Sequence, residues 1–257
     1  MLSRLIQKTF GLPYFPGQWA IASAMRRLLP GGIGLFKDHH SIRYFVHASS
    51  HIGHALARRV DLESDIDSLL PIGPIGLVLD VGCNAGTFGL PLARRARHVV
   101  CIDADSDQIK LLKRTLVLNR ITNVTAIHAA VTSEPASEVI FHVADRLKDL
   151  SARDVSMLDG RDSYTTRTVP ALALETVVAE YGPVDLLKID IEGRSGDAIR
   201  SLGRKLHEVK AILAEPSDDM PTKIPGFSLT QPLVTRVDLP DHLRLTWLAI
   251  RINHETS

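Results

Sequence analysis

The feature of this 257-residue chain that most constrains its fold is a regular alternation that begins at Leu77. From there, short apolar runs of strand length alternate with longer segments whose apolar residues recur at helical spacing, such as Ile109, Leu112 and Leu116. Strand–helix–strand units of this kind form a mostly parallel sheet with helices on its faces. The sequence therefore predicts an α/β fold with a doubly wound, Rossmann-like sheet.

The expected elements follow from the periodicity of the apolar residues. Strands are expected at 41–48, 77–79, 98–102, 124–128, 185–191 and 211–214, and a closing hairpin-like pair at 227–237 and 243–252. Helices are expected at 87–97, 106–119 and 171–181. The polar and less regular segment 132–168, which contains Arg153, Arg161 and Arg167, is interpreted as an insert that shapes the acceptor site.

Composition limits the class of protein. Hydrophobic residues make up 45% of the chain, which is enough for a packed core. The formal net charge is only +1, whereas nucleic-acid-binding proteins usually carry a basic excess, so we expect no nucleic-acid partner. The two cysteines exclude a disulfide scaffold and favour a cytoplasmic location. No apolar run approaches the roughly 20 residues that cross a bilayer, so no transmembrane segment is expected.

We expect two parts in the chain, an N-terminal extension at 1–40 and one larger domain at 41–257. The extension has no acidic residue before Asp38. Such a segment is either a basic flank that packs on the domain or a transit or membrane-surface segment. The sequence leaves open whether the protein is a homo-oligomer.

The loop after the first core strand is the first candidate site, because ligands of such sheets bind beyond the carboxyl ends of the strands. In its sequence, LVLDVGCNAGTFG, Gly82 and Gly86 permit a tight turn and close approach of a ligand. The carboxylate of Asp80 would repel a pyrophosphate but suits a positively charged ligand such as S-adenosylmethionine. Asn84 fills space that a dinucleotide-binding loop usually leaves bare. The loop therefore favours S-adenosylmethionine over a dinucleotide.

The end of the next strand supplies a ribose partner. Asp103 lies about 20 positions after Gly82, which is the spacing of a carboxylate that accepts hydrogen bonds from ribose hydroxyls. NAD and S-adenosylmethionine share that ribose, so Asp103 supports a nucleoside without choosing between them. Ala130, after the following strand, is small and apolar and suits either the wall against an adenine ring or plain packing.

Four segments together resemble the FkbM family of S-adenosylmethionine-dependent methyltransferases, a class I methyltransferase fold. They are DVGCNAGTFG, CIDAD, NVTAIHAAV and, most specifically, LLKIDIEG, within a resemblance that covers about residues 40–215. The resemblance implies O-methylation of a hydroxyl on a sugar or natural-product-like small molecule. The expected cofactor contacts are Asp80, Gly82, Cys83, Asn84, Gly86, Phe88, Asp103, Ala104 and Ala130. The chain departs from the family at Ser195, where a second Glu is common, with Asp197 two positions further on.

The segment that carries the resemblance also holds the expected catalytic residues. Methyl transfer to a hydroxyl needs an aligned acceptor and a group that takes its proton. Strand alternation places Lys188, Asp190 and Glu192 on one face, and Asp190 and Glu192 lie near the carboxyl end. We predict that Asp190 is the base or acceptor-orienting group, that Glu192 lies beside it and that Lys188 holds the carboxylates. A buried polar cluster that only fixes the strand end is the alternative.

Three further questions stay open at the level of sequence. Two carboxylates with a third oxygen ligand suit Mg²⁺, although no histidine spacing demands a metal. An NAD-linked oxidoreductase on a similar sheet is a competing function, which Asp80 and the KIDIEG segment argue against. A second competing function is that of a non-catalytic cofactor-binding protein.

Overall fold

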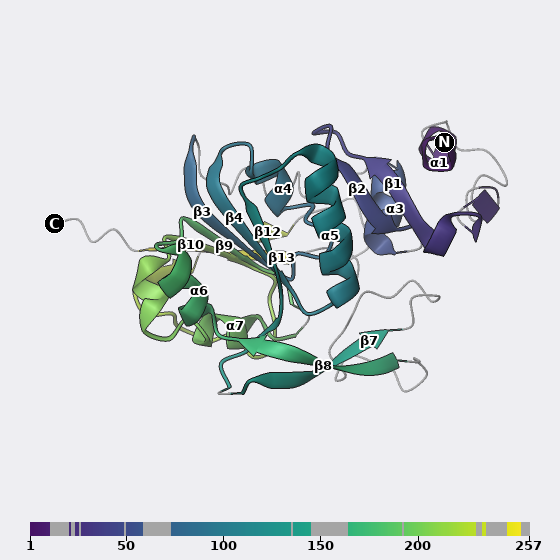
Figure 1. Ribbon diagram of the computed structural model, residues 1–257. Helices are drawn as coiled ribbons and strands as arrows, with labels where there is room; N and C mark the ends of the chain where they lie inside the picture. Colours follow the sequence, from purple (N-terminus) through teal and green to yellow (C-terminus); the bar gives the residue numbers. More distant parts are fainter. Residues whose placement is uncertain are drawn as a thin grey trace.

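The computed structural model shows a central sheet with helices on both faces and two smaller β-structures beside it (Figure 1). It describes residues 1–10, 21, 24–25, 27–48, 50–58, 73–134, 136–144, 164–191, 193–229, 233–234 and 246–252. None of the helices in these ranges is long and apolar enough to cross a membrane.

The central sheet has the strand order β11-β13-β10-β9-β3-β4-β5. Its parallel strands are β3 (Ile75–Val81), β4 (Ala96–Asp103), β5 (Val124–His128), β9 (Leu186–Ile189) and β10 (Ala211–Ala214). The strand β13 (Thr246–Ile252) runs antiparallel beside β10 and pairs with β11 (Phe227–Leu229) and β12 (Leu233–Val234). The chain order reverses at β3, which lies between β4 and β9. Ligands of doubly wound sheets bind at such a switch point.

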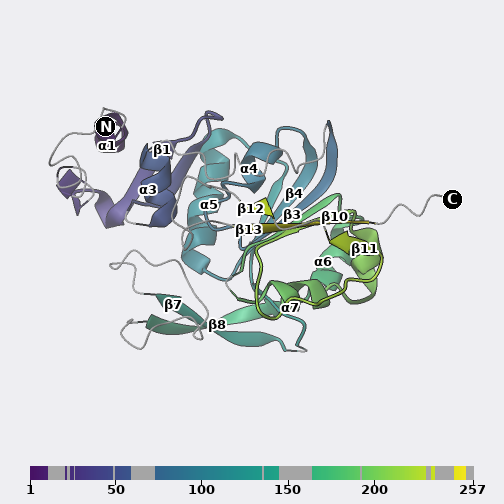
Figure 2. The ribbon, with the colours of Figure 1, turned by 180° about the vertical axis from the view of Figure 1, so that it is seen from behind.

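The two faces of the sheet bury separate hydrophobic clusters, because successive side chains of a strand point to opposite faces. On β3, Val78 belongs to one cluster, whereas Leu77 and Leu79 belong to the other. The first face is covered by α4 (Gly89–Leu92) and α5 (Ser106–Asn119), and the second by α6 (Leu174–Tyr181), α7 (Ser195–Arg200) and the 3₁₀ helix η5 (Gly203–Glu208) (Figures 1 and 2). This arrangement confirms the predicted doubly wound, Rossmann-like fold.

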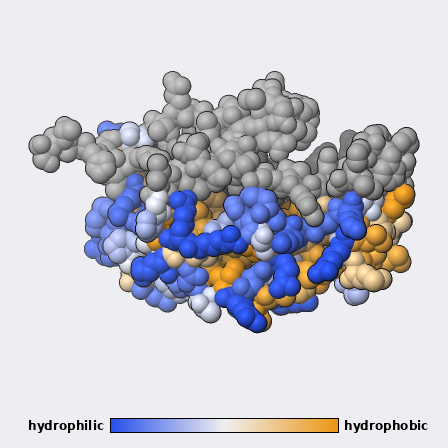
Figure 3. Space-filling model, turned by 90° about the horizontal axis from the view of Figure 1, so that it is seen from above, coloured by the Kyte–Doolittle hydropathy of each residue, from blue (hydrophilic) through white to orange (hydrophobic). Residues whose placement is uncertain are grey.

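The N-terminal residues form a module that packs on α5. It contains α1 (Leu2–Phe10), the 3₁₀ turn η1 (Pro30–Gly32), the antiparallel strands β1 (Ile33–Lys37) and β2 (Arg43–His47), and α3 (His51–Arg58). The side chain of Thr115 accepts a hydrogen bond from the backbone of Phe45 (3.0 Å), which fixes β2 to α5. The boundary expected at residue 40 falls in the turn between β1 and β2. Large hydrophobic side chains of this module lie at the surface, among them Met1, Leu5 and Leu28, and Figure 3 shows hydrophobic surface at this end.

The segment expected to be an irregular insert contains regular structure instead. It contains β7 (Glu138–Ala144) and the start of β8 (Tyr164–Leu172), which pair with β6 (Ala130–Val131), just before the segment, in the order β6-β8-β7. The strands β7 and β8 pair along their length, from Glu138 opposite Pro170 to Ala144 opposite Tyr164. Backbone hydrogen bonds stabilise this pair although the segment has little hydrophobic periodicity. The positions of Arg153 and Arg161 lie outside the described residues.

Other elements follow the sequence closely, with one exception. The observed bounds of α5, β5 and β10 are those predicted. The helix expected at 87–97 is only the four-residue α4, because the chain turns at Ala93–Arg95 and enters β4 at Ala96. There the carbonyl of Arg95 accepts a hydrogen bond from the Ile75 amide (3.0 Å), so this segment aligns the starts of β3 and β4.

Candidate functional site

The loop after β3 is held in shape by its own backbone and by its neighbours. Gly82 has a φ of +71°, and a Cβ at this position would lie 1.8 Å from the carbonyl oxygen of Asp190. Only glycine therefore allows the loop to lie against the end of β9. The amides of Gly82 and Cys83 both donate to the carbonyl of Ile102, at 2.9 and 3.1 Å. Asn84 has a φ of +48°, a conformation that asparagine tolerates better than most residues.

The loop also binds directly to Asp103 at the end of β4. The Asn84 amide donates to one carboxylate oxygen (2.7 Å), and the Asp105 amide donates to the other (2.8 Å). A carboxylate has about four acceptor positions, so both oxygens can still accept a ribose hydroxyl. Burial raises the pKa of Asp103 to about 6, although the two amides oppose this shift. Asp103 lies where the sequence predicted, and its contact with the ribose stays a prediction.

Asp80 occupies a position beneath the loop rather than at its surface. Its side chain is fully buried, and its Oδ2 accepts a hydrogen bond from the amide of Gly89 at the start of α4 (3.0 Å). Its Oδ1 lies 3.3 Å from the ammonium of Lys188. Burial raises the pKa of Asp80 above the usual carboxyl range, and the Lys188 ammonium opposes that shift. The carboxylate thus has partners inside the protein, and its predicted attraction for the cofactor would act from beneath the loop.

Lys188 joins the two strands that meet at the switch point. Its ammonium lies 3.2 Å from a carboxylate oxygen of Asp190 and donates to the carbonyl of Gly82 (3.1 Å). The lysine side chain is 4% exposed, whereas that of Asp190 is 40% exposed. One buried cation therefore contacts a buried carboxylate, the loop after β3 and a partly exposed carboxylate. The structure brings together two of the three predicted catalytic residues, and Glu192 lies outside the described residues.

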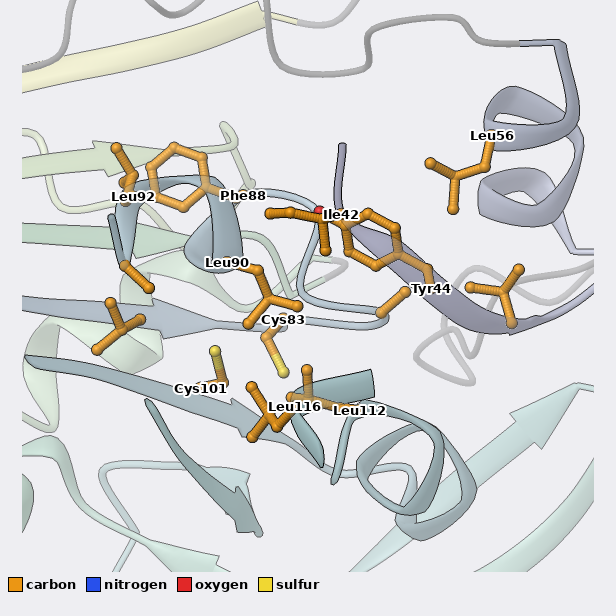
Figure 4. Close-up of a cluster of buried hydrophobic side chains, with 14 of the residues drawn as sticks. Ile42, Tyr44, Leu56, Cys83, Phe88, Leu90, Leu92, Cys101, Leu112 and Leu116 are labelled. Atoms are coloured by element: carbon orange, nitrogen blue, oxygen red, sulfur yellow. The ribbon is translucent and has the colours of Figure 1, made fainter. Parts of the chain in front are cut away.

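Two predicted cofactor contacts point into the core instead of toward the sheet edge. Cys83 and Phe88 are almost fully buried and lie in the hydrophobic cluster that includes Leu90 and Leu112 (Figure 4). Burial raises the pKa of the Cys83 thiol well above its ordinary value, so it stays protonated. Their side chains pack the loop onto α4 and α5, which leaves the backbone for any contact with a cofactor.

The other predicted contacts lie at the carboxyl edge of the sheet. Gly82, Asn84, Ala104 and Ala130 are partly exposed there, and Gly86 is buried. Sequence reasoning missed His128, which ends β5, is partly exposed and lies 3.0 Å from the Ala104 carbonyl through its Nε2. Its position as the last residue of a parallel strand was the signal that could have identified it.

The side chain of Arg167 forms ion pairs with carboxylates at the start of α5. Its guanidinium, on β8, lies 3.2 Å from a carboxylate oxygen of Asp107 and 3.7 Å from one of Asp105, at the start of α5. These contacts hold the β7–β8 hairpin beside the end of β4 and the start of α5. Sequence reasoning assigned Arg167 to the acceptor site, and the structure gives it carboxylate partners on α5.

The acidic residue after the departure from the FkbM pattern also acts internally. Asp197 is almost fully buried in α7, where it accepts hydrogen bonds from the hydroxyl of Ser133 and from Arg194 (3.0 Å). Among the described residues, no group of three or more His, Cys, Asp or Glu side chains could hold a metal ion. The Mg²⁺ option stays a prediction.

Comparison with known proteins identifies the type of domain. Residues 78–158, which include the loop and Asp103, match the model of a family described as a methyltransferase domain. Curated relatives include the 23S rRNA (uracil(1939)-C(5))-methyltransferase RlmD of Vibrio parahaemolyticus, which is 38% identical over 52 residues, 20% of this chain and 12% of that protein. The same enzyme of Stenotrophomonas maltophilia is 36% identical over 69 residues, 27% of this chain and 16% of that protein. The chain thus spans less than a fifth of the length of these relatives.

Two solved structures align with most of this chain at low sequence identity. Trm5b from Pyrococcus abyssi aligns with a TM-score of 0.49 and 12% identity, over 86% of this chain and 56% of that one. TrmK from M. capricolum, in complex with S-adenosylhomocysteine, aligns with a TM-score of 0.44 and 10% identity, over 75% of this chain and 69% of that one.

The relatives contradict one expectation. The curated relatives are methyltransferases of ribosomal RNA, which overturns the exclusion of nucleic acid and, with it, the expected small-molecule acceptor. The exclusion rested on the net charge of +1, and a whole-chain charge does not show where basic residues gather on the folded surface. The fold and the matched domain are those of a class I methyltransferase with S-adenosylmethionine as cofactor, whereas the finer resemblance to the FkbM family stays a prediction.

Proposed function

We propose that the protein is an S-adenosylmethionine-dependent methyltransferase in which Asp190 orients the acceptor or takes its proton. The observation that carries this proposal is the pair of ion contacts made by Lys188, at 3.3 Å to Asp80 and 3.2 Å to Asp190. The negative charge of the buried Asp80 stabilises the Lys188 ammonium inside the protein. The same ammonium then holds Asp190 in place. Asp190 itself is 40% exposed at the carboxyl edge, where an acceptor can reach it.

The cofactor would lie across the loop after β3, with its ribose hydroxyls on Asp103. When bound, S-adenosylmethionine supplies an activated methyl group, so alignment of the acceptor contributes much of the catalysis. Asn84 positions Asp103 through its amide, and Gly82 keeps the loop close to Asp190. The contacts described above thus connect the residue that holds the donor with the residue that meets the acceptor.

We propose RNA as the acceptor class, which the names of the matched relatives support. The relatives match only a part of this chain, so the acceptor needs a direct assay. Purified protein is incubated with S-adenosylmethionine labelled in its methyl group and with ribosomal or transfer RNA. Digestion of the product to nucleosides then distinguishes a methylated base from a methylated ribose.

The decisive variant is Asp190→Asn, which keeps the shape of the side chain but removes the proton acceptor. Loss of a positioned general base lowers the rate about 10²- to 10⁴-fold. The dissociation constant of S-adenosylhomocysteine, measured by calorimetry, should stay at the wild-type value. Glu180→Gln, at an exposed carboxyl on α6, is the matched control and should retain full activity.

Three outcomes would contradict the proposal. Unchanged transfer by Asp190→Asn would remove Asp190 from the mechanism. Incorporation into no RNA fraction would reject the acceptor class. Tight binding of NAD without any binding of S-adenosylhomocysteine would favour the oxidoreductase that the sequence left open.

A further inference from the structure

The outer face of α5 carries a row of basic side chains. The residues Ile109, Leu111, Leu112, Thr115 and Leu116 are buried and form the inward face of the helix. Lys110, Lys113, Arg114 and Val117 follow one another at helical spacing on the exposed face. This face is not the mixed, charge-balanced surface of an ordinary solvated helix, because the only acidic residue of α5 is Asp107 in its first turn.

Residues from outside the helix extend this row. Arg43, on β2, donates from its guanidinium to the carbonyl of Leu118 (3.1 Å) near the carboxyl end of α5. Arg120 caps the helix in the left-handed conformation and is exposed. The guanidinium of Arg114 lies 4.2 Å from the ring centre of Phe45, also on β2, which holds it at the surface by a cation–π contact. The five residues Arg43, Lys110, Lys113, Arg114 and Arg120 are called the α5 basic strip.

The strip carries uncompensated positive charge. Lys110 pairs with Asp107 (3.1 Å), but Lys113, Arg114 and Arg120 form no ion pair within the part of the chain that the structure describes. Asp107 is itself also bound by Arg167. Side chains held in place with their charges unbalanced are suited to a polyanion, because such a partner releases its own counterions on binding.

The position of the strip relates it to the candidate site. The helix α5 lies between the sheet and the β1–β2 pair (Figure 1), and its first turn follows Asp103 directly. Its 14 residues make it about 21 Å long, so the strip runs from the ribose-binding edge toward the opposite edge of the sheet. A chain of phosphates lying along it would lead to the point where the methyl group is delivered.

We infer that the α5 basic strip binds the sugar–phosphate backbone of the RNA acceptor and guides it to the cofactor edge. This inference rests on the proposed function, because that function supplies the polyanion. It adds a binding surface outside the residues that hold the cofactor, and it assigns the N-terminal module a role, since β2 contributes Arg43 and fixes Arg114. The contacts are with phosphates, so they provide affinity and register rather than sequence recognition.

The test measures RNA binding directly, without methyl transfer. The probe is a fluorescein-labelled single-stranded oligouridylate, titrated by fluorescence anisotropy at several salt concentrations. Lys113→Gln combined with Arg120→Gln removes two charges of the strip and touches no other described contact of these side chains. We expect the affinity to fall at least about tenfold, and the slope of log affinity against log salt to decrease by about 2.

The matched control is Arg204→Gln combined with Lys223→Gln. These two exposed residues lie on the α6–α7 side of the sheet, and their loss changes the net charge by the same amount. The control should keep the wild-type affinity and slope. All proteins should show the same urea unfolding midpoint and the same affinity for S-adenosylhomocysteine, so that a change in RNA binding reflects the surface.

Several results would overturn the inference. Equal weakening in both double variants would mean that only net charge matters, and an unchanged slope in the strip variant would place the phosphates elsewhere. If the strip variant lost binding to phosphatidylserine vesicles but bound RNA as the wild type does, the strip would be a membrane-binding surface instead. If the strip variant loses RNA binding but the wild type methylates no RNA, the strip is an RNA-binding surface and RNA is rejected as the methyl acceptor. If the wild type and the strip variant methylate RNA equally, the strip does not guide the acceptor and the proposed function is retained.

Discussion

The loop after β3 and the end of β9 lie against each other, yet different forces hold them. The loop is fixed mainly by backbone contacts, namely the left-handed conformations at Gly82 and Asn84 and amide hydrogen bonds to Ile102 and Asp103. The end of β9 is fixed by charge, through the Lys188 ammonium between Asp80 and Asp190. The first kind of contact gives a rigid shape for the cofactor. The second holds the carboxylate of Asp190, for which we propose a role in meeting the acceptor.

This difference predicts that shape and charge can be damaged separately. Gly82→Ala removes a backbone contact and Lys188→Met removes an ion contact, and each has a control elsewhere with the same chemical change.

The largest effect is expected for Gly82→Ala. Its added Cβ would lie 1.8 Å from the Asp190 carbonyl, so the loop must move away from β9. We expect a loss of more than about 4 kcal/mol in the free energy of unfolding, measured by urea titration. Gly73→Ala is the control, because Gly73 also has a positive φ (+89°) but nothing within 4 Å of the added atom. That variant should lose only about 1–2 kcal/mol, and equal losses in both would remove the close approach as the cause.

A smaller but still large effect is expected for Lys188→Met. The substitution leaves Asp80 buried without its cation, which should cost about 3 kcal/mol. Without the ammonium, the pKa of Asp80 in the folded protein rises further above its value in the unfolded chain. A raised pKa favours the folded state at low pH, and this stability is lost as the pH rises through the folded-state pKa of Asp80. The loss relative to wild type should therefore be larger at pH 8 than at pH 5.

The control lysine is Lys210, which directly precedes β10. Lys210 pairs with Asp185, next to the start of β9, but its side chain is 68% exposed. Lys210→Met should cost less than about 1 kcal/mol, because solvent screens that pair. A Lys188→Met protein with wild-type stability at both pH values would mean that the buried pair contributes nothing.

The smallest effect concerns the pH dependence of cofactor binding. Asp103 has a pKa of about 6, and we expect only its ionised form to accept both ribose hydroxyls. The affinity for S-adenosylhomocysteine should be constant above pH 7 and about tenfold weaker at pH 5, measured by calorimetry. Asp103→Asn should bind more weakly throughout and lose this pH dependence. A wild-type affinity that does not change between pH 5 and pH 8 would separate Asp103 from the ribose.

Much of the fold could be predicted because the relevant signals are local. Apolar periodicity predicted the bounds of α5, β5 and β10, and the glycine spacing located the loop after β3. The prediction was wrong where local pattern is weak or misleading. Residues 93–97 continue a helical pattern but turn into β4, and the polar insert forms the β7–β8 pair through backbone hydrogen bonding that no side-chain pattern reports.

The sequence predicted which residues lie at the candidate site better than it predicted how their side chains are arranged. The sequence placed Asp80, Asp103 and Asp190 near the carboxyl ends of strands, with Lys188 on the same face as Asp190. It did not show that Asp80 is fully buried while Asp190 is open, because burial depends on the helix that covers each strand end. Nor did it show that Cys83 and Phe88 turn into the core.

The sequence by itself determined the order of the parallel strands of the central sheet along the chain, the glycine-containing loop and the cofactor class that this loop suits. These properties follow from backbone geometry and side-chain type within short stretches of chain. Only the tertiary structure decided which carboxylate faces solvent, which cation lies between two carboxylates, and where basic side chains gather although the whole chain is nearly neutral. Burial and the distances between charges arise from contacts between residues far apart in the chain, and no local pattern contains them.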